Sequence, residues 1–176
     1  MLVKILNFKE EYSKYFYELN VEWLKMYFYV EEHDEEILSN PKKFIIDPGG
    51  IILFAQCDSK IIGTVALIPV TEDKCFELTK MAVSPDYRGN KIGQIILENC
   101  INKAKEMGLE KLILYSNRVL KNAIHIYKKN GFGANKYKVY QVSSDAGTRY
   151  MSNRTREGSF LKPSNQNTGD LSAEIA

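Results

Sequence analysis

The feature that most constrains the fold is a turn with two glycines that stands between an apolar strand and an amphipathic helix. The strand ends at Val83, the turn covers Arg88 to Gly93, and apolar residues at helical spacing follow as far as Met107. Glycines let the backbone turn so that successive N–H groups converge, and the unbonded N–H groups of the first helical turn lie directly behind them. Because the helix dipole favours an anion there, this order of elements predicts a phosphate site.

The letters of this turn narrow the choice of ligand. They do not form the G-x-G-x-x-G pattern of dinucleotide-binding folds, and they lack the Gly-Lys-Ser/Thr ending of a P-loop. NAD and nucleoside triphosphates are therefore poor candidates, whereas a pyrophosphate group fits, with Arg88 or Lys91 supplying a counter-charge. On its letters alone, the turn could equally be an ordinary connection between a strand and a helix.

The remaining sequence predicts a sheet with helices between its strands. Segments rich in β-branched residues indicate strands, and apolar residues recurring every three or four positions indicate helices. The expected strands are 1–8, 51–57, 61–70, 75–83 and 111–115, with a hairpin made by 132–141 and 148–151, and the expected helices are 10–28, 93–107 and 120–130.

Bulk composition excludes several classes of protein. The chain has 176 residues, 44% of them apolar, which suits one domain with a single core. The 24 basic and 22 acidic side chains are interspersed and give a net charge of +2, so a nucleic-acid partner is not expected. Three cysteines without paired spacing favour reduced thiols. With neither a signal peptide nor a membrane-spanning run in view, a cytoplasmic protein with no membrane partner is expected.

The chain changes character after residue 152. Polar and charged residues dominate 153–176, so the predicted organisation is a domain over 1–152 followed by a disordered polar tail. A tail of this kind could instead dock on a partner or fold back on the domain.

Two motifs in order resemble the GNAT superfamily of N-acetyltransferases. The family's core motif, Arg/Gln-x-x-Gly-x-Gly/Ala after an apolar strand, resembles Arg88–Gly93 after the strand Leu78–Val83. The second motif is similar to Ser116-Asn117, Leu120, Ala123-Ile124, Tyr127 and Gly131-Phe132. The resemblance covers residues 1 to about 152.

This resemblance implies an α/β (α+β) fold and a cofactor. The fold is a mixed, mostly antiparallel twisted sheet of about six to seven strands flanked by about four helices, and a splayed strand pair forms a cleft for acetyl-CoA. The implied contacts are the backbone of Met81, Ala82 and Val83 with pantetheine, the turn with pyrophosphate, and asparagines and a tyrosine from the far side. The implied cofactor-binding residues are Met81, Ala82, Val83, Arg88, Gly89, Asn90, Lys91, Ile92, Gly93, Gln94, Asn117, Asn122 and Tyr127.

The chain departs from the family pattern at two places. Lys91 stands where the family has its first glycine, which carries a steric cost if φ there is positive, although its ammonium could reach a phosphate. Leu120 stands where many relatives have asparagine, which leaves Asn117 as a substitute.

Acetyl transfer to an amine requires a base for the protonated amine and a proton for the departing thiolate. Glu77 lies on the strand that flanks the turn, and strict alternation would place it on one face with Met81 and Val83, so it is a candidate base acting through water. It could instead be structural, bonding a neighbouring strand or a lysine. Tyr127 reads as a core aromatic from its surroundings, and the resemblance implies that it protonates or contacts the sulfur.

An acidic run after the first predicted helix is a candidate for acceptor recognition. Trp23, Tyr29, Glu31 and Glu32 could line a pocket that attracts a cationic amine, although such runs are usually a solvated helix face. The expected acceptor is a small-molecule or peptide amine, and a homodimer is left open. His33 and His125 lack metal-ligand spacing, so no metal is expected.

Two other functions compete with the enzyme. A regulatory module could hold acetyl-CoA or CoA without turnover, and a protein-interaction domain could use the aromatic first helix with the turn as a mere connection. Stabilisation of the fold by acetyl-CoA would exclude the protein-interaction domain. Release of thiol in the presence of an amine would exclude both alternatives.

Overall fold

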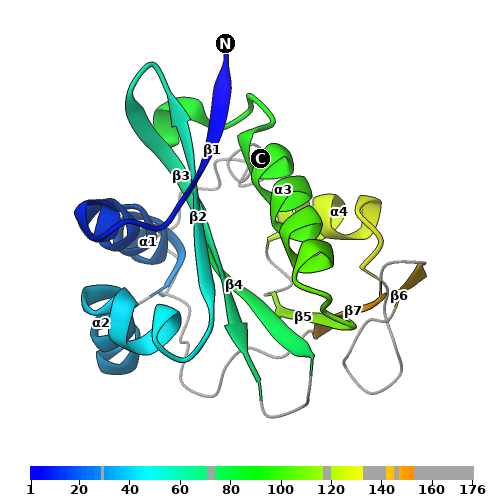
Figure 1. Ribbon diagram of the computed structural model, residues 1–176. Coiled ribbons are helices and arrows are strands. Elements are labelled where there is room, and N and C mark those ends of the chain that lie inside the picture. The colour runs from blue at the N-terminus through cyan, green and yellow to red at the C-terminus, as the bar shows by residue number, and fades with distance from the viewer. Residues whose placement is uncertain (29, 71–73, 117–119, 133–141, 145–146, 153–176) are drawn as a thin grey trace.

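A single twisted sheet organises the chain (Figure 1). The computed structural model describes residues 1–28, 30–70, 74–116, 120–132, 142–144 and 147–152. Its strands run in the order β1-β2-β3-β4-β5-β7-β6. Their bounds are β1 Val3–Asn7, β2 Ile51–Cys57, β3 Lys60–Pro69, β4 Cys75–Val83, β5 Lys111–Tyr115, β6 Val142–Ser144 and β7 Gly147–Ser152. The β4–β5 and β5–β7 pairs are parallel, and the other neighbouring pairs are antiparallel.

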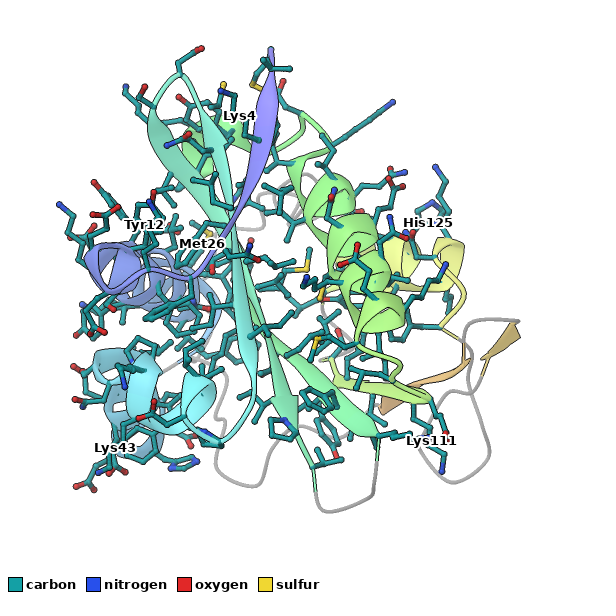
Figure 2. All side chains as sticks on the ribbon, viewed as in Figure 1. Lys4, Tyr12, Met26, Lys43, Lys111 and His125 are labelled. Atoms are coloured by element: carbon teal, nitrogen blue, oxygen red, sulfur yellow. The ribbon has the colours of Figure 1, made fainter. Side chains whose placement is uncertain are left out.

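Helices cover both faces of the sheet (Figure 1). Helices α1 (Ser13–Tyr27) and α2 (Glu32–Ser39) lie on one face, and α3 (Ile92–Glu106) and α4 (Lys121–Lys129) lie on the other. Side chains from the sheet and the helices fill the space between these layers (Figure 2). Phe16 of α1 and Phe54 of β2 are fully buried on the α1 side, while Leu97 and Phe132 are buried on the α3 side, so each face has its own apolar core.

The sequence-based expectations of fold class and of most elements are confirmed. Over the residues that the structure describes, a mixed, mostly antiparallel sheet of seven strands with four α-helices matches the prediction, and the bounds of β2, β4 and β5 agree with those expected. Two details differ. The first predicted helix opens with a separate 3-10 turn, Glu10–Tyr12, and the acidic run forms the start of α2. The hairpin strand expected at 132–141 is observed at Val142–Ser144, and 133–141 and the tail 153–176 lie outside the described residues.

Strand β4 contains a bulge. Thr64 of β3 opposes Ala82, but Ala66 opposes Thr79, so Lys80 and Met81 together stand opposite the single residue between. Lys80 has a φ of 53°, in the left-handed region that side chains disfavour. A bulge of this kind adds one residue to one strand and reverses the facing of every side chain beyond it.

Strands β4 and β5 stop pairing halfway along β4. Their parallel pairing covers Cys75 to Leu78 on β4, and its last pair joins Leu78 to Leu114. From Thr79 to Val83, β4 therefore has β3 on one side and no described strand on the other. This is the parting of strands that the family resemblance implied.

Candidate functional site

The glycine turn leads directly from β4 into helix α3. Gly89 and Lys91 both have positive φ, 77° and 61°, and Lys91 precedes the first residue of the helix, Ile92. Lys91 makes no side-chain cap on the helix, so it leaves the first helical N–H groups without a side-chain acceptor from that position. Gly89 and Lys91 are exposed, and the first N–H groups of α3 have no acceptor within the helix, as at any helix N-terminus.

Side chains within the turn stabilise its shape. The Asn90 amide donates to the carbonyl oxygens of Tyr87, at 3.4 Å, and Arg88, at 3.2 Å. Gln94 donates to Glu98 one turn further along α3, at 2.8 Å. Ile92 and Gly93 are buried where α3 meets the sheet. Gly89, Asn90 and Lys91 are the exposed residues of the turn.

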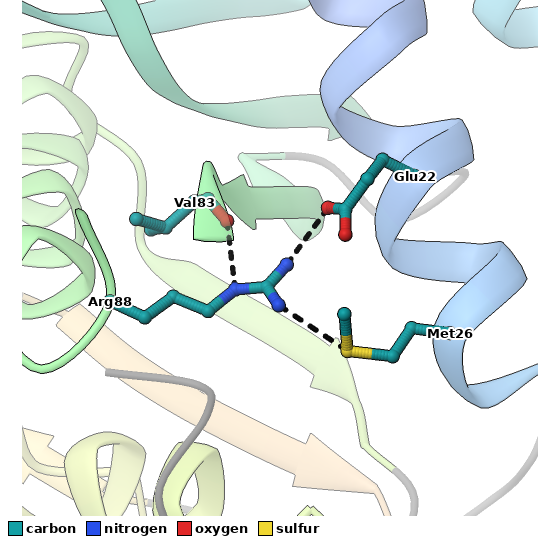
Figure 3. Close-up of polar contacts among 4 residues, drawn as sticks. All are labelled: Glu22, Met26, Val83 and Arg88. Carbon is teal, nitrogen blue, oxygen red and sulfur yellow. Dashed lines mark hydrogen bonds and ion pairs between the residues drawn. The ribbon is translucent and has the colours of Figure 1, made fainter. Parts of the chain in front are cut away.

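Arg88 does not point its charge out of the turn. Figure 3 shows its guanidinium directed at helix α1 and at the end of β4. Nε donates to the Val83 carbonyl at 3.0 Å, one terminal nitrogen lies 2.8 Å from a Glu22 carboxylate oxygen, and the other lies 3.3 Å from the Met26 sulfur. Lys91, which is exposed, is thus the better placed of the two basic residues to supply a counter-charge.

The bulge corrects the predicted facing of Glu77. Glu77 opposes Ile68, whose side chain packs in the core under α1 and α2, whereas Val83 belongs to the core under α3. The expectation that Glu77 shares a face with Met81 and Val83 is therefore wrong, because the extra residue at Lys80 interrupts the alternation. Glu77 is half-buried and faces the α1–α2 layer.

The backbone of Val83 points toward the side of β4 that lacks a partner strand. The Ser84 N–H donates to the Ile62 carbonyl at 2.8 Å, which makes Val83 and Gly63 a non-hydrogen-bonded pair of the antiparallel ladder. In such a pair the N–H and C=O of each residue point away from the other strand. The Val83 N–H is therefore directed to the side on which a cofactor amide could pair with it.

Tyr127 lies on α4 against the α3-side core. Its ring is 6.0 Å from that of Phe132 in an edge-to-face arrangement. Burial, with a smaller effect of the Cys100 thiolate charge, raises the pKa of Tyr127 to about 12. The phenol therefore keeps its proton at neutral pH and has the protonation state of a donor. Burial also raises the pKa of Cys100, which makes this thiol a poor nucleophile.

An aromatic cluster at the end of α1 reaches α4. We define it as Trp23, Tyr27 and Phe28; the Trp23 ring lies 5.6 Å from Tyr27 and 5.5 Å from Phe28. This cluster packs on Leu120 and Ala123, and Tyr127 also contacts it. The indole nitrogen of Trp23 is buried and has no hydrogen-bond partner. The tyrosine and the predicted acceptor-side tryptophan thus belong to one packed unit.

The acidic run divides into residues with different surroundings. Glu31 precedes α2 and has one buried carboxylate oxygen without a hydrogen-bond partner, and Glu32 is exposed in the first turn. Asp34 instead pairs with Lys80 of β4, and Glu35 accepts a hydrogen bond from Tyr17 at 2.6 Å. Asp34 was not among the predicted residues, because nothing in an acidic run marks which member is buried.

Other predicted residues are placed as follows. Asn122 is half-buried on α4, while Asn117 and Tyr29 lie outside the described residues. His33 and His125 are exposed, and Figure 2 shows His125 on the outer side of α4. Within the described part of the chain, no group of three or more His, Cys, Asp or Glu side chains could hold a metal ion. None of the helices described has the length and apolar character needed to cross a membrane.

Solved structures share this fold. An acetyltransferase of the GNAT family from Staphylococcus aureus superposes with a TM-score of 0.69 at 21% identity, over 87% of this chain and 100% of its own. PaiA N-acetyltransferase from Thermoplasma acidophilum, solved in complex with coenzyme A, gives 0.62 at 23% identity, over 84% and 96%. A predicted acetyltransferase with acetyl-CoA from Clostridium acetobutylicum gives 0.62 at 20% identity, over 77% and 92%.

Sequence comparison gives a closer but shorter match. The amino-acid acetyltransferase of Salmonella arizonae is 39% identical over 77 residues, and that of Escherichia coli K12 is 38% identical over the same length. These matches cover 44% of this chain and 16% of each relative, so the chain spans about a sixth of those relatives.

The family model for acetyltransferases of the GNAT family matches residues 8–132. This range contains β4, the glycine turn, α3, β5 and α4, which are the elements that form the candidate site. The match confirms the family that the two sequence motifs predicted. The chain belongs to the acetyltransferase (GNAT) family.

Proposed function

We propose that this chain transfers the acetyl group of acetyl-CoA directly to a primary amine. The observation that carries the proposal is the continuity of two features: the edge of β4 without a partner strand from Thr79 to Val83, and the glycine turn that follows it. An extended pantetheine arm can pair with such an edge as an added strand does, while its pyrophosphate reaches the N-terminus of α3.

The residues proposed to bind the cofactor follow from this placement. The backbone of Met81, Ala82 and Val83 pairs with pantetheine, and residues 88–94 surround the pyrophosphate. Exposed Lys91 supplies the counter-charge, since Arg88 is engaged with Glu22. Asn122, with Asn117 outside the described residues, completes the contact from the far side.

Three groups are proposed to carry out the transfer. Glu77 takes a proton from the protonated amine through water, which frees the lone pair that attacks the thioester carbonyl. The backbone N–H of Val83, which points away from β3, polarises that carbonyl. As the C–S bond breaks, Tyr127 donates its phenolic proton to the thiolate; its pKa of about 12 keeps that proton available.

The acceptor is proposed to be a cationic amine, small or peptide-borne, recognised between α1 and α2. The buried oxygen of Glu31 without a partner would gain one from an ammonium group, and exposed Glu32 adds to the negative potential. Trp23 offers an indole N–H and an aromatic face to such a ligand. Tyr29, in the same stretch, belongs to the proposed acceptor set.

One sample can test the proposal in two steps. Thermal melting with and without acetyl-CoA reports binding, because a ligand that binds only the folded state raises the melting temperature. Thiol release is then followed against polyamines, amino acids and a lysine peptide. A rise with thiol release supports the transferase and begins to identify the acceptor. A rise without release with any amine leaves a module that binds the cofactor without turnover, and no rise contradicts the proposal.

A further inference from the structure

The Arg88 side chain connects three parts of the molecule that are distant in sequence. Its backbone begins the glycine turn, yet its guanidinium extends to Glu22 and Met26 of α1 and to the Val83 carbonyl of β4 (Figure 3). Only 7% of the Arg88 side chain is exposed, whereas 36% of Glu22 is. Each guanidinium nitrogen therefore has a partner within the protein.

These contacts oppose a role for Arg88 as a phosphate ligand. A buried guanidinium is costly without an ion-pair partner, and Glu22 neutralises its charge at 2.8 Å. To reach a phosphate, Arg88 would have to leave Glu22 and the Val83 carbonyl. Lys91 carries the exposed charge of the turn, and its side chain makes no ion pair or hydrogen bond among the contacts of the described residues.

The same contacts give Arg88 another role. The Val83 carbonyl that it holds belongs to the residue whose N–H points to the unpaired side of β4. Helix α1, which it holds through Glu22, ends in the aromatic cluster that packs on α4 beside Tyr127. Arg88 thus fixes two parts of the molecule relative to α1: the end of β4, where the strand has no described partner on one side, and the start of the glycine turn. The aromatic cluster at the end of α1 in turn contacts Tyr127.

We propose that Arg88 is a positioning residue, which holds the pyrophosphate turn and Val83 against α1, so that affinity for acetyl-CoA depends on Glu22. This proposal rests on the proposed function, because it takes the turn to be the pyrophosphate site. The ion pair acts at a distance: Glu22 touches no part of the turn except the Arg88 side chain among the contacts described. Two roles for Arg88 therefore predict opposite effects of a change at Glu22.

The experiment is a double-mutant cycle on acetyl-CoA affinity, measured by calorimetry with wild type, Glu22→Gln, Arg88→Gln and the double variant. If Arg88 positions the turn, each single change weakens binding by about tenfold, as small displacements of a site do, and the double variant is no weaker than either. Glu18→Gln, an exposed site one turn earlier on α1, is the matched control and leaves affinity unchanged. If Arg88 binds phosphate, Glu22→Gln instead preserves or strengthens binding, and that result overturns the proposal.

Two further variants separate charge from geometry. Arg88→Lys keeps the positive charge but cannot reproduce the three contacts of the guanidinium, so its affinity resembles that of Arg88→Gln; rescue by lysine would contradict the positioning role. Glu22→Asp is a milder change for use if Glu22→Gln fails to fold, and it gives an intermediate loss, whereas unchanged affinity would again refute the proposal. Failure of the wild type to bind acetyl-CoA would instead refute the proposed function.

Discussion

The ammonium of Lys80 forms an ion pair with the carboxylate of Asp34, which joins the bulge of β4 to helix α2. Their side chains are only 8% and 14% exposed. Lys80 has a positive φ, which is unfavourable for any residue with a Cβ. The ion pair fixes the Lys80 side chain and so offsets part of that strain. The bulge thus depends on a contact with a helix that lies 46 residues earlier in the chain.

Removing one partner of this pair should destabilise the fold. Asp34→Asn leaves the Lys80 ammonium buried beside a neutral amide, and breaking a buried pair in this way costs about 3 kcal/mol. Urea denaturation measures the loss in the free energy of unfolding. Glu36→Gln, an exposed change on the same helix, is the control and is expected to have almost no effect. Equal stability of the two variants would mean that the pair contributes nothing to the bulge.

We expect lysine at position 91 to make the folded protein less stable than glycine would. Its φ of 61° places it in the left-handed region, where a side chain costs about 1 kcal/mol relative to glycine. Lys91→Gly and Lys91→Ala both remove the ammonium, but only glycine removes the strain. We expect Lys91→Gly to be the more stable of the two by about 1 kcal/mol in urea denaturation. Alanine equal to glycine would show that the turn relaxes when the lysine is lost.

The same pair of variants tests the charge of the turn. Both lack the ammonium, so both are expected to bind acetyl-CoA more weakly than wild type, with less dependence of affinity on salt concentration. Affinity is measured by calorimetry at two ionic strengths. An unchanged salt dependence would indicate that Lys91 does not contact the phosphate.

Periodicity and turn chemistry predicted the order of elements, but they could not predict the bulge. The strand Cys75–Val83 has the expected bounds, yet its alternation breaks at Lys80, a residue that nothing in the sequence marks as left-handed. The predicted facing of the Glu77 side chain relative to Val83 was therefore wrong because of one local backbone angle. The ion pairs were missed for a related reason: Glu22 and Asp34 lie in charged helices, and only tertiary packing selects which carboxylate is buried.

The Tyr127 phenol should remain protonated, and so able to donate a proton, over a wide pH range. Its pKa of about 12 means that the phenol stays protonated well above neutrality, so Tyr127 itself causes no fall in rate below about pH 11. Tyr127→Phe is expected to lower kcat by about a hundredfold while acetyl-CoA binding changes little. Steady-state kinetics and calorimetry check the two parts, and an unchanged kcat would exclude the acid role.

The raised pKa of Tyr127 also affects stability at high pH. Because the folded-state pKa lies above the ordinary value of 10.0, the folded state holds this proton more tightly than the unfolded state. The contribution is fully present below about pH 10 and is lost as pH rises toward 12. Urea denaturation between about pH 9 and 11 should show a shallower loss of stability for Tyr127→Phe than for wild type. Parallel losses would mean that Tyr127 is not responsible.

The bulge changes the predicted facing of the Glu77 side chain, and a pH profile can distinguish a general base from a structural residue at this position. As a general base it removes a proton that the amine loses unaided at high pH, so Glu77→Gln should lower kcat/KM by about a hundredfold near neutrality and by less as pH rises. If Glu77 is structural, Glu77→Gln lowers both stability and rate, and the ratio of wild-type to variant rate does not approach one at high pH. Rates with a fixed amine are compared with unfolding curves of the same samples. A ratio of wild-type to variant rate that stays constant with pH would assign Glu77 to the structure of the sheet and leave the base to be sought between α1 and α2.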